Sequence, residues 1–284
     1  MHPNQEVSKL APYASLVLIV TLGFFLNRIY GDTYRKLNDN QRRGFINHHV
    51  AATAKIMMLI SAAVPFLSIM SGKATLNTHA VGSKATYGDL LLVLFQVFTA
   101  MYIFELFFRA KLSIIAVCHH VGSVAMSAVA VSLAVNWENQ PDATLEFIMC
   151  CLWGLFDIIA ECWPHFAIIL YRVYENDHKF LSKVMLSATI ITLVGTIVET
   201  IVVMYFWASA WYRWTLAFKI VTPILHVVFA AAQLWGTKNF YSMWQSQKRK
   251  LQEKSDDVET GEVTSIISDN TSDKSGSRVT VKTE

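Results

Sequence analysis

The sequence carries too little charge for a soluble protein of its length. Only 16% of its 284 residues are charged, against roughly 25% in an ordinary soluble domain, whereas 54% are hydrophobic. The apolar residues form long blocks that are hydrophobic on every face, instead of the one-sided pattern of a soluble amphipathic helix. This composition predicts an all-α, polytopic membrane bundle, because a helix satisfies its own backbone hydrogen bonds in lipid.

Other absences exclude further classes of protein. The four cysteines lie in apolar blocks and have no CxxC spacing, so neither a zinc site nor a disulfide framework is expected. These cysteines are Cys118, Cys150, Cys151 and Cys162. The formal net charge of +3 is too small to indicate a nucleic-acid partner. The sequence has no internal repeat, and its last apolar block lacks the central lysine of a retinal protein.

Seven apolar blocks approach the length of about 20 residues that a spanning helix needs. The predicted spans are 11–27, 48–70, 88–108, 112–135, 145–171, 183–209 and 216–236. The first block is the shortest, and a signal peptide is the alternative interpretation. However, only Lys9 supplies a positive side chain before it, and no small-x-small cleavage site follows it. We therefore expect a retained first span.

Lysine and arginine residues predict the orientation of the chain. Fifteen of them flank the spans on one side of the membrane and five on the other. With seven spans, this places the N-terminus in the lumen or outside and the C-terminus in the cytosol. After residue 247 the chain is rich in Ser, Thr, Asp, Glu and Lys and has no aromatic residue, which predicts a disordered tail over 248–284.

Ionisable side chains within the predicted spans are costly in hydrocarbon, so each is a candidate functional residue. Asp157, Glu161 and His165 recur every four residues and form one helical stripe, which must face a polar interior. His119 and His120 are adjacent and point about 100° apart, so both cannot face lipid. An imidazole that faces the interior can act as an acid, a base or a nucleophile.

Further candidate residues in or beside the spans are Glu105 and Arg109, Glu199, His226 and Lys55. Glu105 and Arg109 have the spacing of a helical ion pair, and Lys55, early in its predicted span, is expected to snorkel. Counting from the cytosolic ends places the histidines and acids at depths of roughly 10–24 Å. This predicts one polar site in the cytosolic half, among spans four to seven. Scattered structural contacts and a bound cation are the alternatives.

Three stretches together carry a family resemblance. They are a Tyr-x-x-Glu-Leu element at 102–106 followed by the His-His pair at 119–120, the polar segment 43–53, and Glu161-Cys-Trp-Pro164 followed by Arg172. In this order and spacing they resemble the TLC domain, which ceramide synthases share with translocation-associated membrane proteins and lipid-homeostasis proteins. The resemblance covers about residues 42–247. It divides the chain into a first segment at 1–41, with the first span and a basic loop, a TLC-like domain at 42–247 and the tail at 248–284.

The resemblance implies a protein of the endoplasmic reticulum that acts in lipid metabolism or membrane lipid homeostasis, with six spans around a central cavity. Ceramide synthases join an acyl chain from acyl-CoA to the amine of a sphingoid base. The implied catalytic residues here are His119 and His120, with Asp157 and Glu161 as the Asp-x-x-x-Glu part of the synthase signature. Candidate substrate-binding residues are His165, Glu199, His226, Glu105 and Arg109. No metal and no bound cofactor is expected, and acyl-CoA is the expected co-substrate. The expected partners are membrane lipids, a sphingoid base and further copies of the chain in a homo-oligomer.

The chain also departs from the synthase signature, which places His-Asp-x-Ser before the matched aspartate. Residues 153–156 here are Trp-Gly-Leu-Phe, which favours the looser lipid-homeostasis branch over a typical ceramide synthase. The alternatives are a non-catalytic lipid- or cargo-binding protein and a seven-span receptor. A zinc hydrolase of the ceramidase kind would need an HxxxH-like element near the last span, where only His226 occurs.

Overall fold

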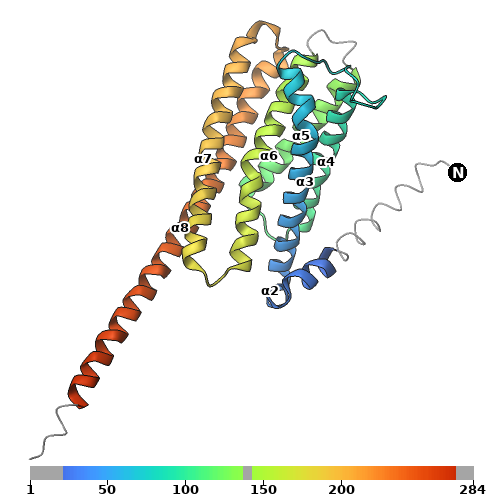
Figure 1. Ribbon diagram of the computed structural model, residues 1–284. Coiled ribbons are helices and arrows are strands. Elements are labelled where there is room, and N and C mark those ends of the chain that lie inside the picture. The colour runs from blue at the N-terminus through green and yellow to red at the C-terminus, as the bar shows by residue number, and fades with distance from the viewer. Residues whose placement is uncertain (1–21, 137–142, 273–284) are drawn as a thin grey trace, which may run out of the picture.

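The computed structural model describes residues 22–136 and 143–272, and this part of the chain is helical, without strands. Residues 22–30 form a short helix that precedes α2. The labelled helices are α2 (Asp32–Arg35), α3 (Asp39–Met70), α4 (Tyr87–Phe108), α5 (Ile114–Asn136), α6 (Ala143–Val173), α7 (His178–Ser209), a 3-10 turn (Trp211–Arg213) and α8 (Leu216–Ser272). The long helices lie side by side as a bundle (Figure 1).

Six of the described helices, α3 to α8, are long and apolar enough to cross a membrane, as expected of an integral membrane protein. Their outer faces expose large apolar side chains, such as Ile60, Ile201 and Val227, as a lipid-facing surface requires. The predicted first span, 11–27, falls mostly on residues outside the described part of the chain, where only 22–27 are helical. The total of seven spans therefore stays a prediction.

Three helices begin with side-chain caps that carry them beyond their apolar blocks. The Asn38 side chain accepts from the Gln41 amide and Gln41 returns a bond to the Asn38 amide, so α3 begins nine residues before the predicted span. Thr86 and Asp89 form a second capping box at α4. Asp177 caps α7 by accepting from the Phe180 amide. Hydropathy alone located the apolar blocks and missed these polar first turns.

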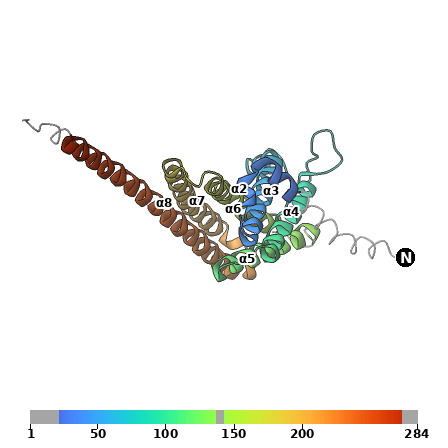
Figure 2. The same cartoon turned by 90° about the horizontal axis from the view of Figure 1, so that it is seen from below.

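The helices form a closed ring in the order α3, α4, α5, α8, α7, α6, and α5 also contacts α6 across the ring. Figure 2 shows this arrangement along the bundle axis. Because α6 packs on α3, α5 and α7, it is the most buried span. Gly195 of α7 allows a close approach to α6, since an added Cβ would lie 3.1 Å from the Ala160 Cβ.

The predicted disordered tail is wrong for residues 248–272, which continue α8 as a helix to Ser272. This segment has no proline, and its Lys, Arg, Gln and Glu residues favour a helix, so a helix that has already begun in the bundle can continue through it. The extension runs away from the bundle (Figures 1 and 2). Residues 273–284 of the predicted tail lie outside the described residues.

Candidate active site

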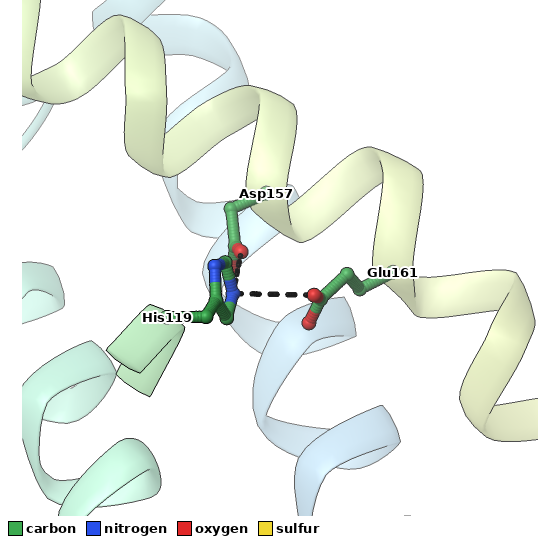
Figure 3. Close-up of side chains that lie close together, drawn as sticks. All are labelled: His119, Asp157 and Glu161. Atoms are coloured by element: carbon green, nitrogen blue, oxygen red, sulfur yellow. Dashed lines mark ion pairs between the residues drawn. The ribbon is translucent and has the colours of Figure 1, made fainter. Parts of the chain in front are cut away.

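A histidine and two carboxylates meet between α5 and α6 (Figure 3). The Nε2 atom of His119 lies 3.1 Å from Asp157 Oδ1 and 3.2 Å from Glu161 Oε1. Asp157 and Glu161 are one helical turn apart on α6, so both carboxylates reach the same imidazole. The structure thus brings together three of the four predicted catalytic residues.

Lys55 of α3 holds the other oxygen of each carboxylate. Its Nζ atom lies 3.0 Å from Asp157 Oδ2 and 2.9 Å from Glu161 Oε2, and the Tyr102 hydroxyl donates to the same Asp157 oxygen. The Lys55 side chain is 0% exposed, so the prediction that it snorkels is wrong. The helix begins at Asp39 rather than near residue 48, which places Lys55 roughly 24 Å along it. The two carboxylates hold the Lys55 ammonium group inside the bundle.

His120 has its own carboxylate partner on α4. Its Nε2 atom lies 3.2 Å from Glu105 Oε2, and the same oxygen lies 3.8 Å from Arg109 Nη1, which confirms the predicted Glu105–Arg109 pair. The two adjacent histidines point to different neighbours because α5 packs between α4 and α6. His119 faces α6 and His120 faces α4, and both are buried.

His165, one turn beyond Glu161, contacts another histidine, His48 of α3. Its Nδ1 atom lies 2.9 Å from the Nδ1 atom of His48 on α3. One ring must donate and the other accept in this contact, so the two rings cannot both carry a proton on Nδ1. The predicted stripe on α6 therefore has its polar partners on α3, α4 and α5.

The other two predicted binding residues lie between α7 and α8. Glu199 Oε2 accepts from Gln233 Nε2 at 2.7 Å, and His226 Nε2 lies 3.1 Å from Thr200 Oγ1. Of these, only Gln233 reaches the central cavity described next; within the described part of the chain, the cavity wall contains neither Glu199 nor His226. The structure thus sets these two predicted residues apart from the histidine pair.

A cavity of about 380 Å³ lies at the centre of the bundle, and all six spans contribute to its wall. Its polar wall, from α3 to α6, contains His48, Glu105, Arg109, His119, His120, Glu161 and His165. The opposite wall, from α7 and α8, includes Thr192, Gln233, Asn239 and several apolar residues. Since Leu112 and Ser113 at the start of α5 also line it, the cavity extends to the end of the bundle where α4 ends and α5 begins.

A second, apolar pocket of about 270 Å³ lies between α5, α6 and α8. Its lining includes Met126, Trp153 and Leu225. The Phe229 ring lies 5.8 Å from the Trp153 ring and 5.5 Å from the His119 imidazole, measured between centroids. The Phe229 ring therefore lies between the apolar pocket and the polar cluster.

The same nitrogen of each ring, Nε2, faces the carboxylates. The Nε2 atoms of His119 and His120 lie within ion-pair distance of carboxylate oxygens but without hydrogen-bond geometry, and neither buried Nδ1 atom has a hydrogen-bond partner among the described residues. A neutral ring whose proton lies on Nε2, toward the carboxylate, keeps a lone pair on Nδ1, as in a histidine base oriented by a carboxylate.

The same residues offer a possible set of metal ligands. One ligand atom each from His119, Asp157 and Glu161 lies within 4.8 Å of the others. Imidazole and carboxylate suit zinc and similar divalent ions. However, the Lys55 ammonium already contacts both carboxylates, and its charge opposes a metal ion at this position.

Comparison of the chain with protein-family models, curated proteins and solved structures finds no match in any of the three. The site is therefore defined by its geometry. Sequence reasoning did not assign Lys55, Tyr102 or His48 to the site. The Asn38-x-x-Gln41 capping signature was the signal that could have placed Lys55 in the middle of its helix.

Proposed function

We propose that this protein is a membrane-embedded acyltransferase that joins an acyl chain to the amine or hydroxyl group of a lipid. One observation carries the proposal: two adjacent histidines, each with a carboxylate 3.1–3.2 Å from Nε2, line the same cavity. A carboxylate at Nε2 stabilises the imidazolium that forms when Nδ1 takes a proton. The arrangement supports general base catalysis within the membrane.

The proposed reaction balances in a simple way. The Nδ1 lone pair of His119 or His120 takes the proton of the acceptor N–H or O–H group as that atom attacks the carbonyl of an acyl thioester, of which acyl-CoA is the expected example. The new C–N or C–O bond forms, the C–S bond breaks, and the imidazolium returns the proton to the departing thiolate. The apolar pocket beside Phe229 is suited to the acyl chain.

The TLC resemblance supports the same class of reaction and remains a proposal. The first histidine of its His-His pair and its Asp-x-x-x-Glu element coincide with the residues that meet in Figure 3, and the second histidine, His120, contacts Glu105. The chain lacks the His-Asp-x-Ser part of the synthase signature, so we do not assign a sphingoid base as the acceptor. We further propose the endoplasmic reticulum as its location, with the cavity open toward the cytosol.

A second candidate function is non-catalytic lipid binding. The observation that favours it is the buried Lys55, whose ammonium group contacts both Asp157 and Glu161 in the way a purely structural network would. In that case the cavity and the apolar pocket would hold a lipid without transforming it. The two functions differ in whether the unpaired Nδ1 atoms are needed.

Substitution of the histidines by glutamine tests the proposal. The glutamine amide can keep the contact that Nε2 makes, but it supplies no basic lone pair in place of Nδ1. In cells lacking the protein, wild type should restore a defined acyl-lipid class. Equally abundant His119→Gln and His120→Gln variants should restore it at least about 100-fold more slowly, since general base catalysis contributes about 10²–10⁴-fold.

His79→Gln is the matched control, because His79 is an exposed loop residue whose imidazole contacts the Lys84 carbonyl, and it does not line the central cavity. It should rescue like wild type. If the double variant His119→Gln/His120→Gln also rescues fully, catalysis by the pair is wrong and lipid binding becomes the better account. Lipidomics of the rescued cells provides the measurement and names the lipid class.

A further inference from the structure

A second polar pocket adjoins the central cavity at the end of the bundle that carries most basic residues, which we call the basic end. This basic pocket has a volume of about 270 Å³ and shares His48, Arg109 and Ile168 with the central cavity. Arg109, Lys111 and Arg172 all line it, together with the Gln41 side chain. These residues come from three different places: the first turn of α3, the segment between α4 and α5, and the end of α6.

The basic pocket has an excess of positive charge. Among the described residues, no aspartate or glutamate lines it, and neither Lys111 nor Arg172 forms an ion pair. Arg109 has one acidic neighbour, Glu105, at 3.8 Å, and His120 contacts the same Glu105 oxygen. Three cations therefore face a pocket of ligand size with no fixed anion of its own.

The positive-inside rule explains why basic residues occur at this end but not why three of them converge on one pocket. Other arginines at the same end behave differently. Arg35 lies 3.7 Å from Asp32 and Arg42 lies 3.8 Å from Asp39, both as exposed pairs within one helical turn. Lys111 and Arg172 differ in lacking such an acidic partner among the described residues, and Arg109 shares its one partner, Glu105, with His120.

We propose that the basic pocket binds a phosphate group of a ligand whose remainder extends into the central cavity. A phosphate carries up to two negative charges and several acceptor oxygens in a tetrahedral arrangement, so groups from three directions can contact it at once. Arginine forks and a lysine are the usual side chains for this task. A single carboxylate would leave most of the positive charge uncompensated.

Such a phosphate has two sources: the headgroup of a membrane lipid or a soluble phosphorylated compound. The shared residues His48 and Arg109 join the basic pocket to the central cavity, so a ligand anchored here can direct its other end toward His119 and His120. Binding of the phosphate does not depend on acyl transfer and can be measured without it.

The test uses the full-length protein in nanodiscs of neutral lipid. The probes are inorganic pyrophosphate and a short-chain phosphatidic acid, with the diacylglycerol of equal chain length as the phosphate-free control. We expect at least one phosphate probe to bind and to raise the melting temperature of the protein. Added salt should weaken this binding, because it screens the charges. Binding of pyrophosphate indicates a soluble ligand, whereas binding of phosphatidic acid alone indicates a lipid headgroup.

The variant Lys111→Gln/Arg172→Gln should lower the affinity for the phosphate probe at least about tenfold, because loss of one charge-assisted contact is enough for that factor. The matched control is Arg35→Gln/Arg42→Gln, which removes the same charge from the same end outside the pocket and should bind like wild type. The proposal is wrong if neither phosphate probe binds, or if both double variants weaken binding equally. His119→Gln should still bind the probe, which separates this proposal from the catalytic one.

Discussion

At the scale of single residues, one lysine and one histidine share two carboxylates. Lys55 and His119 approach the two carboxylates from opposite sides, each contacting one oxygen of Asp157 and one of Glu161. Tyr102 donates to the Asp157 oxygen that Lys55 holds. The lysine therefore fixes both carboxylates in the orientation that presents their remaining oxygens to the imidazole. We infer that Lys55 is a positioning residue for His119.

Removal of the lysine charge should strongly destabilise the protein. In Lys55→Met the carboxylates of Asp157 and Glu161 lose their buried counter-ion, and a broken buried ion pair costs about 3–5 kcal/mol. The melting temperature of the purified protein in detergent should fall clearly. The double variant Lys55→Met/Asp157→Asn removes one charge of each sign and should recover part of the loss. A melting temperature unchanged in Lys55→Met would mean that the pair is not an energetic unit.

At the scale of helices, periodicity predicted which residues share a face but not which neighbour that face contacts. The four-residue spacing of Asp157, Glu161 and His165 correctly indicated a stripe that faces the interior of the bundle, with Asp157 and His165 buried and Glu161 partly buried. Its main partner, Lys55, comes from a helix more than 100 positions earlier, and no local pattern encodes that contact. Glu199 illustrates the same limit in the opposite way. Its predicted depth in the membrane matched that of the site, but its side chain contacts Gln233 instead.

Helix boundaries show the same limit. The ends predicted at 70, 108 and 209 match Met70, Phe108 and Ser209, where an apolar block ends at a loop. The starts of α3 and α7 were placed too late because side-chain caps extend both helices into polar sequence. An error of nine residues in α3 was enough to misplace Lys55.

The close contact between α6 and α7 depends on Gly195. An added Cβ would lie 3.1 Å from Ala160 Cβ and 3.8 Å from Ala160 Cα, so a larger side chain must push the helices apart. Gly195→Val should lower stability by about 1–3 kcal/mol, the usual effect of overpacking. Gly236→Ala in α8 is the control, since an added Cβ there meets nothing within 4 Å. It should be neutral or slightly stabilising, because alanine favours a helix. Equal melting temperatures for Gly195→Val and wild type would exclude a tight α6–α7 contact.

At the scale of the whole molecule, the ring of six helices divides polar from apolar space along its axis. The central cavity and the basic pocket both reach the end where α4 ends and α6 ends, and the apolar pocket lies deeper, beside α5 and α8. α8 is 57 residues long and extends about 85 Å, well beyond a hydrocarbon core of about 30 Å. A ligand with a charged head and an apolar chain is compatible with this order of compartments.

The six described spans place the basic end of the bundle on one side of the membrane. Whether a further span precedes them then determines on which side the N-terminus lies. Arg43, Arg109, Lys111 and Arg172 all lie at this end, which predicts that it faces the cytosol and that the C-terminus does too. If residues 11–27 form a further span, the N-terminus is lumenal, whereas with six spans it is cytosolic. Glycosylation acceptor sites inserted at the N-terminus, in the 71–86 loop and in the 174–177 turn measure all three positions.

We expect the acceptor in the 71–86 loop to be glycosylated and the one in the 174–177 turn to remain unmodified, since these segments lie at opposite ends of the bundle (Figure 1). Glycosylation at the N-terminus then supports seven spans. An unmodified N-terminal acceptor beside a glycosylated 71–86 loop means six spans, with the first apolar block on the cytosolic side. Glycosylation of the 174–177 turn would show that the bundle has the opposite orientation, with its basic end in the lumen. In that case the histidine pair would open toward the lumen, where a cytosolic acyl donor has no access to it.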